Sequence, residues 1–112
     1  MNKIILENAN KAISNGEHEI FLSYLSENTQ WNFVGDKILS GREQVSRYLN
    51  DTYRKPPKFD VEDLVSEGNY VTAVGRIRII DESDQWIEYD YCDIWRFEDG
   101  KMAELKAFVI KR

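Results

Sequence analysis

One acidic residue, Asp93, falls within a row of aromatic residues on a segment with the alternation of a β-strand. Residues 87, 89, 91, 95 and 97 share its face, and all of them are aromatic or aliphatic. A carboxylate that stays charged and unpaired among rings costs several kcal/mol, so we expect its pKa to rise unless donors or a cation satisfy it. Such a group can donate a hydrogen bond to a ligand or exchange a proton with it. Asp93 is therefore the candidate acid or base.

The preceding strand, residues 70–80, suggests how the segment pairs. Placing Arg78 opposite Glu88 and Arg76 opposite Asp90 pairs opposite charges and brings both apolar rows onto the other face. A shift of one residue would scatter the arginines among tyrosines. The charges therefore predict an antiparallel hairpin in this register.

In this register small residues lie beside the acid. Ala73 falls opposite Asp93, and Gly75 falls opposite Tyr91, so we expect open volume next to the carboxyl. This favours an Asp93 that faces a ligand. The alternative is that Asp93 accepts hydrogen bonds from a tyrosine or the backbone and only shapes the core.

The last hairpin has two candidate turns. A type I turn with Gly100 in a bulge would set Asp93 against Leu105, and it is favoured because it keeps Lys106 in water. A two-residue turn at Asp99 and Gly100 would instead bring Lys106 opposite Asp93 as a buried ion pair.

Other residues with ring or amide side chains are candidates for the pocket wall. Trp31 and Phe33 alternate with Asn32, so either the rings or the amide face inward, and the sequence leaves this choice open. The candidates for the pocket lining are Tyr24, Trp31, Asn32, Phe33, Tyr48, Tyr53, Tyr89, Tyr91, Trp95 and Leu105.

Helices come first in the chain and strands follow, the order typical of an α+β fold in one domain over residues 1–112. Ser40 with Glu43 has the spacing of a capping box that opens the third helix, and Pro56 with Pro57 stops it. Hydrophobic periodicity and turn residues predict helices at 2–14, 17–25 and from 41 onward, and strands at 29–34, 37–40, 58–67, 70–80, 86–97 and 102–111.

Composition narrows the function classes. The net charge of -5 disfavours nucleic acids and anionic membrane surfaces, and no apolar run approaches the ~20 residues of a membrane span. Cys92 and His18 are the only residues of their types, so neither an internal disulfide nor a zinc pattern is possible. The sequence implies no metal and no organic cofactor, and it favours a cytoplasmic protein because no signal-peptide pattern is present.

The element order, with the segments WNFVGDKILSGREQV and YDYCDIWRFEDGKMAELKA, resembles the nuclear transport factor 2-like superfamily, in particular SnoaL-like and ketosteroid-isomerase-like proteins. The resemblance implies a cone in which a curved antiparallel sheet wraps around N-terminal helices and a pocket. It also implies homodimers through the outer sheet face, which here would carry Trp86, Cys92 and Ile94. The superfamily includes isomerases, cyclases, epoxide hydrolases and noncatalytic domains, so the fold does not select an activity.

Carried over by position, the resemblance places Asp93 where ketosteroid isomerases keep the protonated Asp of their oxyanion hole. Asn32 stands in place of their base, and Ala9 stands near their oxyanion Tyr, while Tyr24 matches a supporting pocket tyrosine. The catalytic set is therefore broken, which argues against steroid isomerisation. The Asp-Arg-Asp set of epoxide hydrolases is not matched either, because the nearest arginines fall on the outer face.

Three functions follow as expectations. The first is a homodimer that binds a small apolar or aromatic metabolite, with Asp93 making one orienting hydrogen bond. The second is an isomerase, cyclase or dehydratase in which Asp93 exchanges a proton and Asn32 or a tyrosine steadies an oxyanion. The third is a noncatalytic dimerisation module with a filled core.

Overall fold

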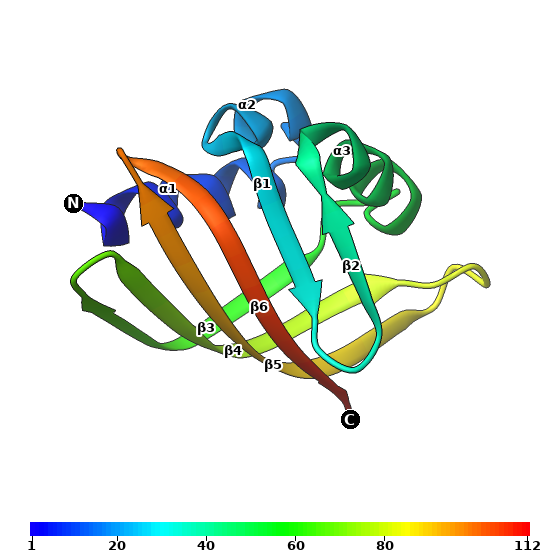
Figure 1. The fold of residues 1–112 in the computed structure, drawn as a ribbon. Helices are drawn as coiled ribbons and strands as arrows, with labels where there is room; N and C mark the ends of the chain where they lie inside the picture. Colours follow the sequence, from blue (N-terminus) through cyan, green and yellow to red (C-terminus); the bar gives the residue numbers. More distant parts are fainter.

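Three helices lie on one face of a curved six-stranded sheet, and the β4–β5 hairpin projects beyond the sheet near the C-terminal end of the third helix (Figure 1). The computed structural model describes all residues, 1–112. In chain order the elements are α1 (Asn2–Ser14), α2 (His18–Ser23), β1 (Leu25–Phe33), β2 (Lys37–Ser40), α3 (Gly41–Thr52), β3 (Lys58–Glu67), β4 (Tyr70–Ile80), β5 (Trp86–Glu98) and β6 (Lys101–Lys111).

The first two helices form a bent pair. Leu6, Ala9 and Ile13 give α1 a buried stripe, and Gly16 follows it with the positive φ of 74° that a glycine adopts without strain. The predicted bounds of α1 are confirmed, whereas α2 ends earlier than predicted, at Ser23. It ends there because the carbonyl of Tyr24 already accepts a hydrogen bond from the backbone at the start of β6. None of the three helices has the length and apolar character needed to cross a membrane.

The start of α3 differs from the predicted capping box. Ser40 makes no side-chain cap bond, and Glu43 pairs with Arg47 at 3.3 Å instead of bonding back to the backbone. Gln44 makes the hydrogen bond that the capping box assigns to Glu43: its Oε1 accepts the Ser40 backbone N–H at 2.8 Å. The helix thus begins where predicted, with one hydrogen bond supplied by the next residue along the chain.

The strand order in the sheet is β2-β1-β6-β5-β4-β3. All neighbouring strands are antiparallel except β1 and β6, which run parallel. Thr29 is fully buried in this parallel seam, and its hydroxyl donates to the carbonyl of Met102 at 3.1 Å. The α+β class and the curved sheet are as expected, and the parallel pair is a feature that the meander of the last four strands did not indicate.

The predicted register of β4 and β5 is confirmed. Arg78 lies opposite Glu88 and Arg76 opposite Asp90, with 3.8 Å between the Arg76 Nε and an Asp90 carboxylate oxygen. Both arginines are exposed on the convex face. Charge pairing on one face of a hairpin was therefore enough to determine which residues oppose one another.

Both predicted registers of the β5–β6 hairpin are wrong. Asp99 and Gly100 form the two-residue turn, with positive φ at both positions, but Asp93 lies opposite Ala107, not Leu105 or Lys106.

The reason is a bulge beyond the turn. Phe97 pairs with Met102, whereas Arg96 pairs with Glu104, so Ala103 has no partner on β5. The extra residue shifts the rest of β6 by one position. Lys106 consequently stays on the convex face opposite Ile94, and no buried ion pair forms.

Gly75 does not provide the open volume predicted for it. A Cβ built there would lie 2.1 Å from the carbonyl oxygen of Asp60 and 3.0 Å from the Cα of Val61, because β3 bulges toward β4 at this point. The space beside Gly75 is filled by backbone, and Ala73 is the small residue that faces Asp93 across this strand pair.

We expect Gly75→Ala to lower the free energy of unfolding by about 1–3 kcal/mol, the usual cost of forcing an extra carbon into a packed site. Chemical denaturation followed by circular dichroism measures it. Gly35→Ala is the comparison, because its Cβ would meet nothing within 4 Å and it tests only the strain of a positive φ. A Gly75→Ala variant as stable as the wild type would contradict the close approach of β3.

Candidate functional site

A cavity of about 710 Å³ lies between the helices and the concave face of the sheet. Most of its wall is apolar or aromatic, and the carboxyl of Asp93 forms part of it. The predicted residues found in the lining are Trp31, Phe33, Tyr48, Tyr53, Tyr89, Tyr91, Trp95 and Leu105, with Asp93 among them.

Two predicted lining residues are elsewhere. Asn32 lies opposite Lys106 on the convex face, since the alternation of β1 turns Trp31 and Phe33 inward. Tyr24 packs against the core where α2 gives way to β1, outside the cavity lining. On this strand the rings of Trp31 and Phe33 therefore face the cavity, and the amide of Asn32 does not.

Asp93 has no hydrogen-bonding partner in the protein: none of the side-chain hydrogen bonds or ion pairs involves its carboxyl. On the two neighbouring strands it faces Ala73 and Ala107, both buried, which offer only methyl groups. Burial raises the pKa of Asp93 from 3.8 to about 7. The carboxyl is therefore poised between its charged and neutral forms near neutral pH.

Edge-to-face ring contacts hold the aromatic wall in place. The Trp31 ring lies 5.6 Å from Trp95, 5.9 Å from Phe21 and 6.3 Å from Tyr48, measured between centroids. Phe21 and Phe59 line the cavity although sequence reasoning had not selected them. Phe21 belonged to the buried stripe of a helix, and that pattern is the same for core and cavity residues.

Tyr48, Tyr53 and Tyr91 of the wall stay protonated at neutral pH. Burial, the largest cause, raises the pKa of Tyr48 to about 12, and it also raises the pKa values of Tyr53 and Tyr91, with a smaller contribution from the charge of Asp93. Two buried polar atoms, Trp31 Nε1 and the Tyr91 hydroxyl, have no hydrogen-bonding partner and are shielded from the cavity surface. They are donors that a ligand does not reach directly.

The mouth of the cavity is acidic. Asp36, Asp51, Asp81 and Glu82 belong to its lining, and Arg54 is the one basic residue among them. Arg54 binds the β4–β5 loop through Asp84, at 3.4 Å, and through the carbonyl of Asp81. Sequence reasoning missed this rim because it is assembled from three segments that are distant in the chain.

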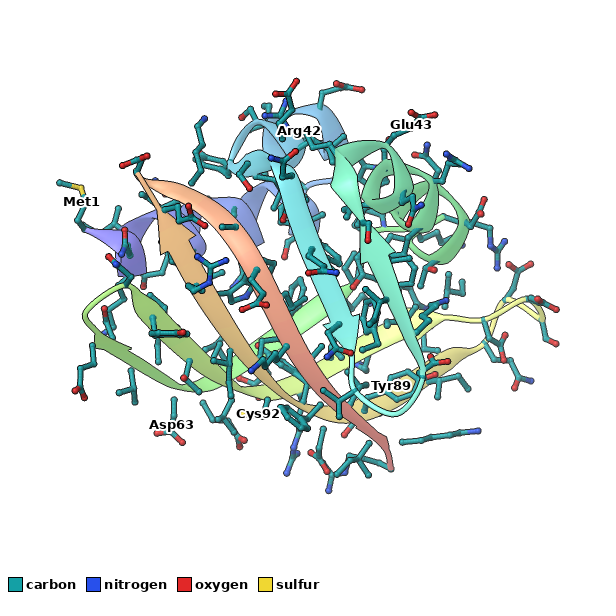
Figure 2. All side chains as sticks on the ribbon, viewed as in Figure 1. Met1, Arg42, Glu43, Asp63, Tyr89 and Cys92 are labelled. Atoms are coloured by element: carbon teal, nitrogen blue, oxygen red, sulfur yellow. The ribbon has the colours of Figure 1, made fainter.

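No group of three or more His, Cys, Asp or Glu side chains is arranged to hold a metal ion. Cys92 lies on the convex side of the sheet, away from the cavity (Figure 2), and burial raises the pKa of its thiol. The ionisable side chains of the cavity are therefore Asp93, the tyrosines of the wall, and the acidic residues and Arg54 of the mouth.

Comparison with known families gives one match. The family model described as a SnoaL-like domain matches residues 6–105. No curated protein matches the chain in sequence.

Solved structures share the fold at low sequence identity. The epoxide hydrolase/cyclase-like enzyme SalBIII, described with pyran ring formation in the polyether salinomycin, has a TM-score of 0.88 at 16% identity over 96% of this chain and 89% of that one. An LEH-like epoxide hydrolase from M. tuberculosis has a TM-score of 0.86 at 13% identity, over 96% of this chain and 81% of that one. A nuclear transport factor 2-like protein of unknown function from Cytophaga hutchinsonii has a TM-score of 0.78 at 18% identity, over 98% of this chain and 100% of that one. At these identities the likeness concerns the fold alone.

Asp93 makes the stability of the protein depend on pH. Below pH 3.8 the Asp93 carboxyl is protonated in both the folded and the unfolded chain. Between pH 3.8 and about pH 7 it stays protonated in the folded chain but is ionised in the unfolded chain. The free energy of unfolding should therefore fall with rising pH in the wild type, relative to Asp93→Asn, by roughly 2–4 kcal/mol across this interval. Denaturation from pH 4 to pH 8 measures it, and a carbon-13 titration of the Asp93 carboxyl with a midpoint near 4 would contradict it.

Proposed function

The chain belongs to the SnoaL-like domain family, and we propose that it binds a small apolar or aromatic molecule in the cavity, with one polar group held at Asp93. The observation that carries the proposal is an unpartnered carboxyl on the mostly apolar and aromatic wall of a cavity. Asp93 is half-buried. Taking a carboxyl away from water without giving it a partner costs free energy, and proteins accept such costs mainly where they bind or react.

The cavity has the size and composition of a ligand site. Its volume of about 710 Å³ lies inside the range of roughly 300–1,000 Å³ typical of small-molecule pockets. Rings packed edge to face supply apolar contact area with little side-chain freedom left to lose. A ligand would thus bury its apolar surface against β1, β5 and α3 and orient itself by the one carboxyl.

Acid–base catalysis by Asp93 is a second candidate, and the pKa of about 7 favours it. Two of the similar structures are described as epoxide hydrolase or cyclase-like enzymes. Of the two partners considered for an oxyanion, Asn32 is on the convex face, so a wall tyrosine would have to take that role. Arg76 and Arg78 point away from the cavity, and Arg54, the one arginine in the lining, is bound to the β4–β5 loop, so an Asp-Arg-Asp set has no support here.

Asp93→Asn separates the two candidates. A binding protein should lose affinity only, whereas an enzyme should keep binding and lose turnover. The noncatalytic module with a filled core is disfavoured by the cavity volume.

A second copy of the chain is the partner that we propose for the convex face. Trp86, Phe108 and Ile110 are exposed there, with Ile110 at 68%. Charges of both signs lie among them, as in the pairs Arg112–Glu88 and Arg76–Asp90, so two copies related by a twofold axis can oppose unlike charges. We also propose a reducing compartment such as the cytoplasm, because the single cysteine leaves no disulfide to protect.

Filling the cavity should abolish ligand binding. Val109 lines the cavity but is 44% exposed, so Val109→Phe should block the space without unfolding the chain. Thermal-shift screening of small apolar ketones, alcohols, acids and amines should give hits with the wild type that disappear in this variant. Val34→Phe is the matched control, since Val34 is 46% exposed and lies outside the lining. Hits that survive Val109→Phe would place binding elsewhere.

Charge on the convex face should prevent self-association. We expect the wild type to sediment as a dimer at micromolar concentrations and the double variant Phe108→Glu, Ile110→Glu to sediment as a monomer, because two buried carboxylates would face their copies. Ile4→Glu, on an exposed position of α1, should remain dimeric. A wild type that is monomeric in analytical ultracentrifugation would refute the dimer.

A further inference from the structure

We infer that the polar group held at Asp93 is a protonated amine, so that the ligand class is an aromatic or alicyclic organic cation of modest size. The inference rests on the proposed function, and it adds the charge and chemical type of the ligand. Three independent features of the cavity lead to it: the missing partner of Asp93, the balance of charge in the lining, and the rings that surround the carboxyl.

The first feature is the missing partner. The strands beside Asp93 present Ala73 and Ala107 to it, and neither a Lys, an Arg nor a His lies against it from the helices. The titratable groups that face it are tyrosines, from α3 and β5, and none of them donates a hydrogen bond to its carboxyl. An ammonium group would supply both the counter-charge and the donors that the fold leaves out.

The second feature is the charge of the lining. Four acidic residues at the mouth add to Asp93, against the guanidinium of Arg54 in the lining and Lys37 over the ring of Tyr48. The Asp81 carboxylate also accepts the backbone N–H groups of Ser83 and Gln85, so Asp36, Asp51 and Glu82 are the acids left to attract a cation. Arg54 is already bound to the β4–β5 loop through Asp84 and the carbonyl of Asp81. Because a cleft lined by one sign of charge attracts the opposite sign, the mouth draws in cations and repels carboxylic acids.

The third feature is the ring system. A cation is attracted to the face of an aromatic ring within about 6 Å, most strongly where water is excluded. The protein's own Lys37 Nζ lies 5.0 Å from the centroid of the Tyr48 ring, so a ligand cation would use the other rings of the wall. Phe33 and Tyr53 pack against the same ring, and both line the cavity together with Asp93.

A neutral ketone fits these features less well. Trp31 Nε1 and the Tyr91 hydroxyl are buried, so the ketone carbonyl would have to accept from the hydroxyl of Tyr53 or Tyr89, and the Asp93 carboxyl would stay without a partner. Protonated Asp93 could donate, but the acidic mouth would then contribute nothing to recognition. An amine uses the carboxyl, the rings and the mouth together.

Three probes of the same shape test the charge. They are 2-(1-naphthyl)ethylamine, 2-(1-naphthyl)ethanol and 1-naphthaleneacetate, which share the naphthalene ring and differ in the polar group. Isothermal titration calorimetry at pH 8 compares them, since Asp93 is mostly charged there and an alkylamine is still protonated. We expect the amine to bind at least about tenfold more tightly than the alcohol, and the acid to bind more weakly than both.

Two variants test whether a preference for the amine comes from the acidic residues of the cavity. Asp93→Asn should reduce the advantage of the amine over the alcohol to within about threefold, because the amine loses its counter-charge and the naphthalene contacts are the same for both probes. Glu82→Gln, at the exposed mouth, should weaken the amine by about twofold at low salt and leave the alcohol unaffected. This second variant keeps the test valid if Asp93→Asn alters the fold.

The outcomes separate this inference from the proposed function. If the alcohol or the acid binds as tightly as the amine, and Val109→Phe abolishes that binding, the cavity is a ligand site but the amine assignment is wrong. If none of the three probes binds and Val109→Phe changes no hit of the wider screen, the ligand site itself is refuted. An amine preference that persists in Asp93→Asn would also overturn the assignment.

Discussion

Strand β5 is hydrogen-bonded on both sides over nearly its whole length, and this double pairing is the constraint on which the rest of the molecule depends. A strand held by two neighbours cannot rotate about its axis, so the alternation of its side chains is fixed. Asp93, Tyr91 and Trp95 must face the helices, while Cys92 and Ile94 must face outward. The concave and convex surfaces of the sheet, and therefore the cavity and the proposed dimer face, inherit their chemistry from this strand.

Two irregularities on the flanking strands give the sheet its shape without disturbing β5. One is the bulge in β3 where the backbone passes over Gly75, and the other is the extra residue Ala103 in β6. Bulges increase local twist and bend a strand, which lets the sheet curve around the helices. Ala103 also restores the inward direction of Leu105 and Ala107 after the tight turn.

The cavity combines features that work against stability. A carboxyl without a partner and two shielded donors without acceptors lie in a wall that could have been closed by a larger side chain at Ala107. Rigid packing of the rings around Trp31 keeps the space from collapsing. Such an arrangement makes physical sense where a bound molecule replaces what the protein lacks, since a site held open in advance needs little reorganisation to bind.

Local patterns in the sequence determined the α+β class, nearly all the strands, the β4–β5 register and the inward direction of Asp93, because periodicity and cross-strand charge act over a few residues. Tertiary structure alone decided the parallel pairing of β1 with β6, the bulge at Ala103, and the outward placement of Asn32. It also assembled the acidic mouth from distant segments. These depend on contacts between residues far apart in the chain, and competing registers of such contacts differ by packing energies that no local pattern encodes.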